Sequence, residues 1–178
     1  KNAIGKSNFG LALFDIITHL SGKNVTPGLY DYYLNNRNSK GYAEFRYVFS
    51  FDTSEIGYMY RKDDKQKLLY EQVTIDQKLL FDYDYKKNHG DFSELRRISS
   101  TLNLDNLDVD SVLRYIIANT SLSDSHPLRQ LMRFVSTMLW FRSLDENRYI
   151  GYKTKSNDYS DFLFKNGELK RFEDFLHR

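Results

Sequence analysis

Residues 42–85 place the strongest constraint on the fold, because apolar and polar side chains alternate along them in steps of two. The segment YAEFRYVFSFD (42–52) puts an aromatic ring at every second position, namely Phe45, Tyr47, Phe49 and Phe51. Period two predicts a strand with one covered face. Segments 58–62, 67–76 and 78–85 read as further strands, the last with alternating Leu79, Phe81, Tyr83 and Tyr85. Short connections favour antiparallel neighbours, so we expect a β-meander of three or four strands.

A helical pattern precedes this meander. In NFGLALFDIITHL (8–20) apolar residues recur three and four positions apart, and further apolar residues widen the stripe. A stripe of that width predicts a helix that is covered on most sides. We expect this helix to lie against the aromatic face of the strands, since both faces need cover.

The chain returns to helical spacing after residue 90. Asp91 is expected to be the N-cap of a helix that runs to about Leu102, with Glu94 at a capping-box spacing. Asp108 is expected to cap a second helix. Pro127 suits the first turn of a third helix, which continues through LRQLMRFVSTMLWFRSL. We read RYIGYK as a short strand or extended link, and the last twenty residues as helix.

Composition limits the class of protein. The chain has 26 Lys and Arg against 24 Asp and Glu, so its net charge is only +2. That balance argues against a nucleic-acid-binding surface over the whole chain, although a local basic patch is compatible with it. The chain has no cysteine, which excludes disulfides and thiolate metal sites and fits a reducing cytoplasm. No apolar run approaches the ~20 residues that span a bilayer, so we expect a cytoplasmic protein without a membrane partner.

The first ten residues, KNAIGKSNFG, match the end of a phosphate-binding loop. That loop reads G-x-x-x-x-G-K-[ST], so Lys1 to Ile4 fit the spacer, Gly5-Lys6-Ser7 close the motif, and its first glycine would precede Lys1. Backbone N–H groups and the positive end of the following helix face the phosphates in such a loop. Lys6 would reach the β- and γ-phosphates, and Ser7 would bind Mg²⁺. The alternative is an incidental Gly-Lys-Ser in a flexible terminus.

The wider stretch NAIGKSNFGLAL resembles the loop of ABC-type ATPases related to SMC and OLD proteins. Their loop reads G-x-N-x-x-G-K-S-N before an apolar helix, and Asn2 and Asn8 match both asparagines. Bacterial AAA-like ATP-binding proteins of the abortive-infection and OLD-like group are similar further along, with aromatic-rich antiparallel strands and then a helical insert. The resemblance implies ATP and Mg²⁺ as cofactors, Lys6 as a catalytic residue and Ser7 as a metal ligand. It implies a nucleotide-binding set of Asn2, Ala3, Ile4, Gly5, Lys6, Ser7 and Asn8.

The same resemblance implies an α+β fold. The chain would be a partial ABC-type ATPase head, in which the loop helix packs on an antiparallel β-meander and a helical segment follows. Residues 1–90 would form a partial P-loop ATPase lobe, and residues 91–178 a helical insert or lid. The full-length protein would hydrolyse ATP as a head dimer with itself, in DNA transactions or phage defence, with DNA or an effector nuclease or toxin as partner.

The chain also departs from that family pattern. It has no later strand ending in the Asp-Glu pair of a Walker B motif and no L-S-G-G-like signature. We therefore expect the remaining parts of the head to lie in a longer protein and this portion alone to be inactive. The alternative function is a non-catalytic α+β protein-interaction module.

Other polar residues give weaker signals. Gln72 or Gln77 could serve as the Mg²⁺-sensing glutamine of an ABC-type head, or could be solvated strand residues. The four histidines have no metal-ligand spacing, so we expect none to be a ligand: His19, His89, His126 and His177. Arginines enrich the helical segment and form either a solvated face or a surface for DNA phosphates: Arg96, Arg97, Arg129, Arg133, Arg142 and Arg148.

Overall fold

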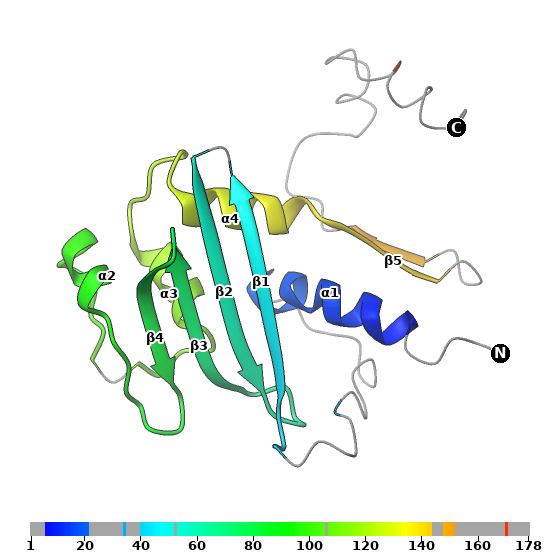
Figure 1. The fold of residues 1–178 in the computed structure, drawn as a ribbon, viewed down its shortest axis with the longest axis horizontal. Helices are drawn as coiled ribbons and strands as arrows, with labels where there is room; N and C mark the ends of the chain where they lie inside the picture. Colours follow the sequence, from blue (N-terminus) through cyan, green and yellow to red (C-terminus); the bar gives the residue numbers. More distant parts are fainter. Residues whose placement is uncertain are drawn as a thin grey trace. The chain divides into compact units, whose positions relative to one another are not determined.

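The computed structural model describes residues 6–21, 34, 40–51, 53–105, 107–143, 148–151 and 170. These residues belong to two compact units, residues 1–135 and residues 136–178. The helices of the first unit are α1 (Lys6–Ser21), α2 (Ser93–Ile98), α3 (Val112–Asn119) and α4 (Pro127–Thr137, ending in the second unit). Its strands are β1 (Ala43–Phe51), β2 (Ser54–Lys62), β3 (Leu68–Ile75) and β4 (Lys78–Asp84) (Figure 1). The second unit contains an antiparallel pair, β5 (Leu139–Ser143) and β6 (Arg148–Gly151).

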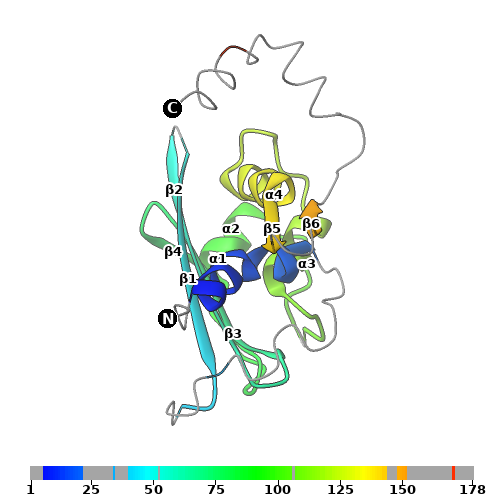
Figure 2. The ribbon, with the colours of Figure 1, turned by 90° about the vertical axis from the view of Figure 1, so that its right-hand side faces the viewer.

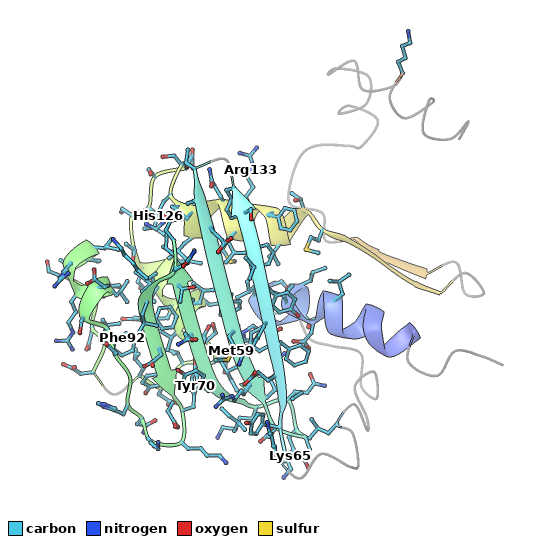
Figure 3. The ribbon with its side chains drawn as sticks, in the orientation of Figure 1. Met59, Lys65, Tyr70, Phe92, His126 and Arg133 are labelled. Carbon is cyan, nitrogen blue, oxygen red and sulfur yellow. The ribbon has the colours of Figure 1, made fainter. Side chains whose placement is uncertain are left out.

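The four strands of the first unit form an antiparallel sheet in the order β1-β2-β3-β4. The predicted α+β fold with a β-meander is therefore confirmed. The register places Phe45 opposite Tyr60, Tyr60 opposite Glu71, and Glu71 opposite Tyr83, so one row of side chains crosses the whole sheet. Helices α1, α3 and α4 lie on one face of this sheet (Figure 2). Met59 and Tyr70 lie on the other face, over which the described residues place no helix (Figure 3).

The aromatic alternation of β1 has the predicted consequence. Every second residue from Ala43 is half-buried, and the intervening residues are exposed. Phe45 stacks on Tyr60 at 5.0 Å between ring centroids, and Phe49 meets Phe134 of α4 edge-on at 5.7 Å. The rings remain half-buried rather than fully buried because β1 is an edge strand of the sheet.

Strand β4 breaks the alternation that the sequence predicts for it. Val73 pairs with Phe81 but Thr74 pairs with Leu79, so Leu80 is an extra residue in β4. This β-bulge turns two consecutive residues, Leu80 and Phe81, into the core, while Leu79 stays half-buried. A bulge shifts the inward face by one residue, which a strict period of two cannot represent.

The β3–β4 connection is a two-residue turn made without glycine. Asp76 and Gln77 have φ angles of 50° and 65°. Positive φ at both central residues is the geometry of the tight turn whose twist matches that of the flanking strands. Asp76 also accepts a hydrogen bond from the Glu55 backbone N–H at 2.9 Å through Oδ1, which ties the turn to β2.

The helices α2 and α3 begin later than predicted. The Asp91 carboxylate accepts hydrogen bonds from the Ser93 N–H (2.9 Å) and hydroxyl (2.6 Å), so it makes a local turn instead of a capping box with Glu94. Helix α2 ends at Ile98, short of the predicted Leu102. Ser111, and not Asp108, caps α3 by accepting from the Arg114 N–H at 3.2 Å.

The helix α4 begins at Pro127 as predicted but ends at Thr137. Its predicted continuation is wrong, because Leu139–Ser143 is the strand β5, paired with β6. The aromatic residues Trp140 and Phe141 suit a strand, and an available partner strand outweighs the helical spacing. The predicted helix over 159–178 lies outside the described residues, apart from Lys170. The proposed division at residue 90 stays a prediction.

The covered face of α1 is narrower than the sequence suggests. Ile16, Ile17 and Leu20 are buried, but Leu13 is 45% exposed. The prediction that α1 is covered on most sides is therefore wrong at Leu13. The buried face also contains two polar residues, Asp15 and Thr18. Both residues belong to the candidate functional site.

Candidate functional site

Three residues of the predicted phosphate-binding set, Lys6, Ser7 and Asn8, lie in α1. The backbone of Lys6, Ser7 and Asn8 is helical, and their side chains lie outside the described part of the structure. Asn2, Ala3, Ile4 and Gly5 also lie outside the described residues. The roles of these seven residues therefore remain predictions. In the described backbone, α1 includes Lys6 and Ser7 and runs unbroken to Ser21.

A buried ion pair holds α1 to the sheet. The Lys62 Nζ donates to Asp15 Oδ2 at 2.7 Å, and the Tyr60 hydroxyl donates to the same oxygen at 2.6 Å. The side chains of Lys62 and Asp15 are 6% and 2% exposed. Burial, aided by the negative charge of Asp15, raises the pKa of Tyr60 well above its usual range, so its hydroxyl keeps its proton and acts as a donor. A buried charge is tolerated only with such partners.

His19 connects this pair to a second buried cluster. Its ring stacks on Tyr60 at 4.2 Å between centroids, and its Nε2 lies 2.6 Å from the Tyr58 hydroxyl. Burial, followed by the positive charges of Lys62 and Arg114, holds the pKa of His19 well below its usual value. The imidazole is therefore neutral at pH 7. It forms part of the hydrogen-bonded core.

The second cluster surrounds Glu71, which has no exposed surface. Its Oε1 accepts from Tyr58 (2.7 Å) and Ser111 (2.9 Å) hydroxyls and from the Leu113 N–H (3.3 Å). Its Oε2 accepts from the Tyr85 hydroxyl (2.6 Å) and the Val112 N–H (2.8 Å). The carboxylate thus occupies the N-terminus of α3, where free backbone N–H groups and the helix dipole favour negative charge.

A cavity of about 470 Å³ lies beside the C-terminal half of α1. Its walls include Thr18, His19, Lys62, Tyr85 and Arg114, and also the loop before α3. His19 lies thirteen residues after Lys6, which corresponds to about 20 Å along a helix. The cavity is therefore at the opposite end of α1 from the predicted phosphate loop.

The structure separates the two candidate glutamines. Gln72 lies on β3 and is half-buried, whereas Gln77 is in the exposed β3–β4 turn. A Mg²⁺-sensing role for either residue stays a prediction.

The histidines and arginines are dispersed. Among the described residues, no group of three or more His, Asp or Glu side chains is placed to hold a metal ion. His177 lies outside the described residues. Arg96 and Arg97 are exposed and pair with Asp105 (3.4 Å) and Glu94 (2.6 Å), and Arg129 and Arg133 are also exposed. The side chains of Arg142 and Arg148 are not among those described.

The sequence patterns assigned no role to Asp15, Lys62 or Glu71, although one signal pointed to Asp15 and another to Lys62. Asp15 stands between Phe14 and Ile16 in an apolar helix, where a charged residue is unusual. Lys62 follows Tyr58 and Tyr60 at the same period-two parity, which places it on the inward face of β2. Neither signal identifies the partner of a buried charge.

A comparison with protein families finds one whose model matches residues 1–178 and is described as "AAA domain, putative AbiEii toxin, Type IV TA system". Comparisons with curated proteins and with solved structures gave no match. In the part of the chain that the structure describes, no helix is both long and apolar enough to cross a bilayer.

Proposed function

The chain belongs to this family of AAA domains linked to AbiEii and type IV toxin–antitoxin systems, and from that premise we propose that Gly5-Lys6-Ser7 is its phosphate loop. The predicted resemblance to abortive-infection-related P-loop proteins is confirmed by the family match. Membership in an AAA family implies nucleotide binding. The assignment of that binding to Lys6, Ser7 and their neighbours is our proposal.

The observation that carries this proposal is the position of α1. The motif needs a helix that runs on from its lysine, and Lys6 and Ser7 lie in α1, which continues unbroken to Ser21. A helix start offers free N–H groups and positive dipole charge to a phosphate. Lys6 adds a cation and Ser7 a hydroxyl, which are the donor types that a Mg²⁺–triphosphate requires. These residues fit Mg-ATP.

Each residue has a separate role in this proposal. Asn2, Ala3, Ile4 and Gly5 would supply loop backbone around the phosphates, and Asn8 would follow them in the first helical turn. Lys6 would neutralise charge on the β- and γ-phosphates, and Ser7 would ligate the Mg²⁺. Bound Mg-ATP supplies the phosphoryl group whose transfer to water the full-length head would promote through positioning and charge neutralisation.

The finer proposal concerns the whole protein. We infer an SMC/OLD-like head that dimerises with itself and acts in phage defence or DNA transactions. The family description supports an association with a toxin–antitoxin system. DNA, or an effector nuclease or toxin, remains the proposed partner, and the exposed Arg129 and Arg133 are candidate phosphate contacts.

The test uses ATP turnover by the full-length protein. Lys6→Ala and Ser7→Ala should each lower turnover by about a hundredfold, the usual loss for one electrostatic element on a transferring group. Lys65→Ala is the matched control, because Lys65 is an exposed lysine in the β2–β3 turn (Figure 3). Turnover that is unchanged in both loop variants would end the phosphate-loop assignment. The codons before Lys1 give a second test, since a strand pattern ending in glycine should be encoded there.

A further inference from the structure

We propose that Asp15, bonded to Lys62 and Tyr60, is a positioning residue for the phosphate loop. It fixes the rotation of α1 and its position along the helix axis relative to β2, and thereby the place of Lys6 and Ser7. This inference rests on the proposed function, because it assigns a role in ATP turnover to residues outside the loop.

The contact between Asp15 of α1 and the two residues of β2 is directional. Asp15 Oδ2 accepts from Lys62 Nζ at 2.7 Å and from the Tyr60 hydroxyl at 2.6 Å, in a place where both charged side chains are buried. Such short charge-assisted bonds weaken steeply with distance and angle. The apolar contacts of Ile16 and Ile17 are non-directional, so they resist separation of α1 from the sheet more than they resist sliding or rotation.

Both sides of this contact lie in regular secondary structure. Lys62 and Tyr60 lie on β2, which is hydrogen-bonded to β1 on one side and β3 on the other. Asp15 lies nine residues after Lys6 in one uninterrupted helix, at about 14 Å along its axis. A rotation of α1 at Asp15 is therefore passed to its first turn. Groups that act on a transferring phosphate lose activity when they are misplaced by about 1 Å.

A buried ion pair can often be replaced by apolar residues of similar size without loss of stability, whereas removal of one partner leaves a buried charge unpaired. Stability alone therefore does not require this pair. An all-apolar replacement separates the two roles, because it removes the directional bonds without leaving a buried charge unpaired.

The experiment compares two variants of the full-length protein with a matched control. The first combines Asp15→Leu, Lys62→Met and Tyr60→Phe, and the second is Tyr60→Phe alone, which keeps the ion pair. The control is Tyr83→Phe, which also removes a buried tyrosine hydroxyl, but one that donates to Leu107 O at 3.4 Å instead of to α1. Steady-state kcat and KM for ATP are measured below the thermal unfolding midpoint of every variant.

We expect the triple variant to lower kcat by about tenfold or more while KM changes by less than about threefold, since binding needs less exact placement than transfer. Tyr60→Phe should lower kcat by a smaller factor, and Tyr83→Phe should leave kcat unchanged. If the triple variant does not fold, Tyr60→Phe decides the question. A normal kcat in the triple variant, or in Tyr60→Phe when only that variant folds, overturns the proposal.

Lys6→Ala measured in parallel separates this proposal from the proposed function. Loss of turnover in Lys6→Ala with a normal kcat in the decisive Asp15-cluster variant refutes only the positioning role. Normal turnover in both Lys6→Ala and Ser7→Ala refutes the phosphate loop itself, and the positioning role with it.

Discussion

Replacement of Glu71 should be among the most destabilising single changes in the first unit. Its carboxylate accepts from three hydroxyls and two backbone N–H groups while it has no exposed surface. We consider Glu71→Ala, which removes every acceptor, and Glu71→Gln, which keeps the shape and one oxygen.

The expected magnitude follows from the donors that lose their acceptor. Two of the five donors keep other contacts, since Tyr58 lies 2.6 Å from His19 and the Val112 N–H donates to the Tyr85 hydroxyl at 2.9 Å. A third donor, the Leu113 N–H, makes only a long bond of 3.3 Å to Glu71. That leaves about two donors without partners, at about 1–3 kcal/mol each, plus about 1 kcal/mol for the charge at the helix N-terminus. Glu71→Ala should therefore lower the free energy of unfolding by about 5 kcal/mol, and Glu71→Gln by about 2 kcal/mol.

Urea unfolding followed by fluorescence measures both free energies. Gln72→Ala is the control, because Gln72 is the next residue of β3 and lies on the opposite face of the sheet. It should change the free energy of unfolding by no more than about 0.5 kcal/mol. A loss of less than about 1 kcal/mol in Glu71→Ala would refute the reasoning, since it would mean that the surrounding donors find partners without the carboxylate.

Three further predictions concern pH and backbone geometry. Burial, followed by the positive charges of Lys62 and Arg114, lowers the pKa of His19 in the folded state. Below pH 6.5 the proton is therefore gained mainly by the unfolded state. The free energy of unfolding then falls by up to about 1.4 kcal/mol for each pH unit. His19→Gln should remove this contribution to the pH dependence of the free energy of unfolding. An unchanged pH dependence contradicts the prediction. Gly90→Ala should lower the free energy of unfolding by more than about 2 kcal/mol, because a Cβ there would overlap the Asp82 carbonyl. Gly41→Ala should lower it by about 1 kcal/mol, because Gly41 has a φ of +69° although no atom would lie within 4 Å of the added Cβ. Equal thermal midpoints for the two alanine variants would contradict this. Gln77→Gly should raise the free energy of unfolding by up to about 1 kcal/mol by relieving a φ of 65°, and a lower thermal midpoint would argue against turn strain.

The sequence by itself determined the elements whose signal is periodic and local. The aromatic alternation around Phe45 predicted β1 and its inward face, and helical spacing predicted α1, because a strand or helix side is set by residues two to four positions apart. The Gly-Lys-Ser motif that leads into α1 is equally local, and it led to the family that the comparison confirmed. The parity of β2 also implied that Lys62 faces inward, although its partner could not be deduced.

Only the tertiary structure decided which polar residues meet. Lys62 bonds to Asp15 across 47 positions of sequence, and Ser111 bonds to Glu71 across 40. Such pairs depend on strand register and on where each helix crosses the sheet, and no local pattern encodes either. The bulge at Leu80 is likewise visible only in the pairing of β4 with β3. The late start of α3 depends on a long-range contact too, since Glu71 accepts from the first N–H groups of that helix. Buried charges are stable only beside their partners, so these long-range contacts, and not the periodicity of any segment, determine the polar core.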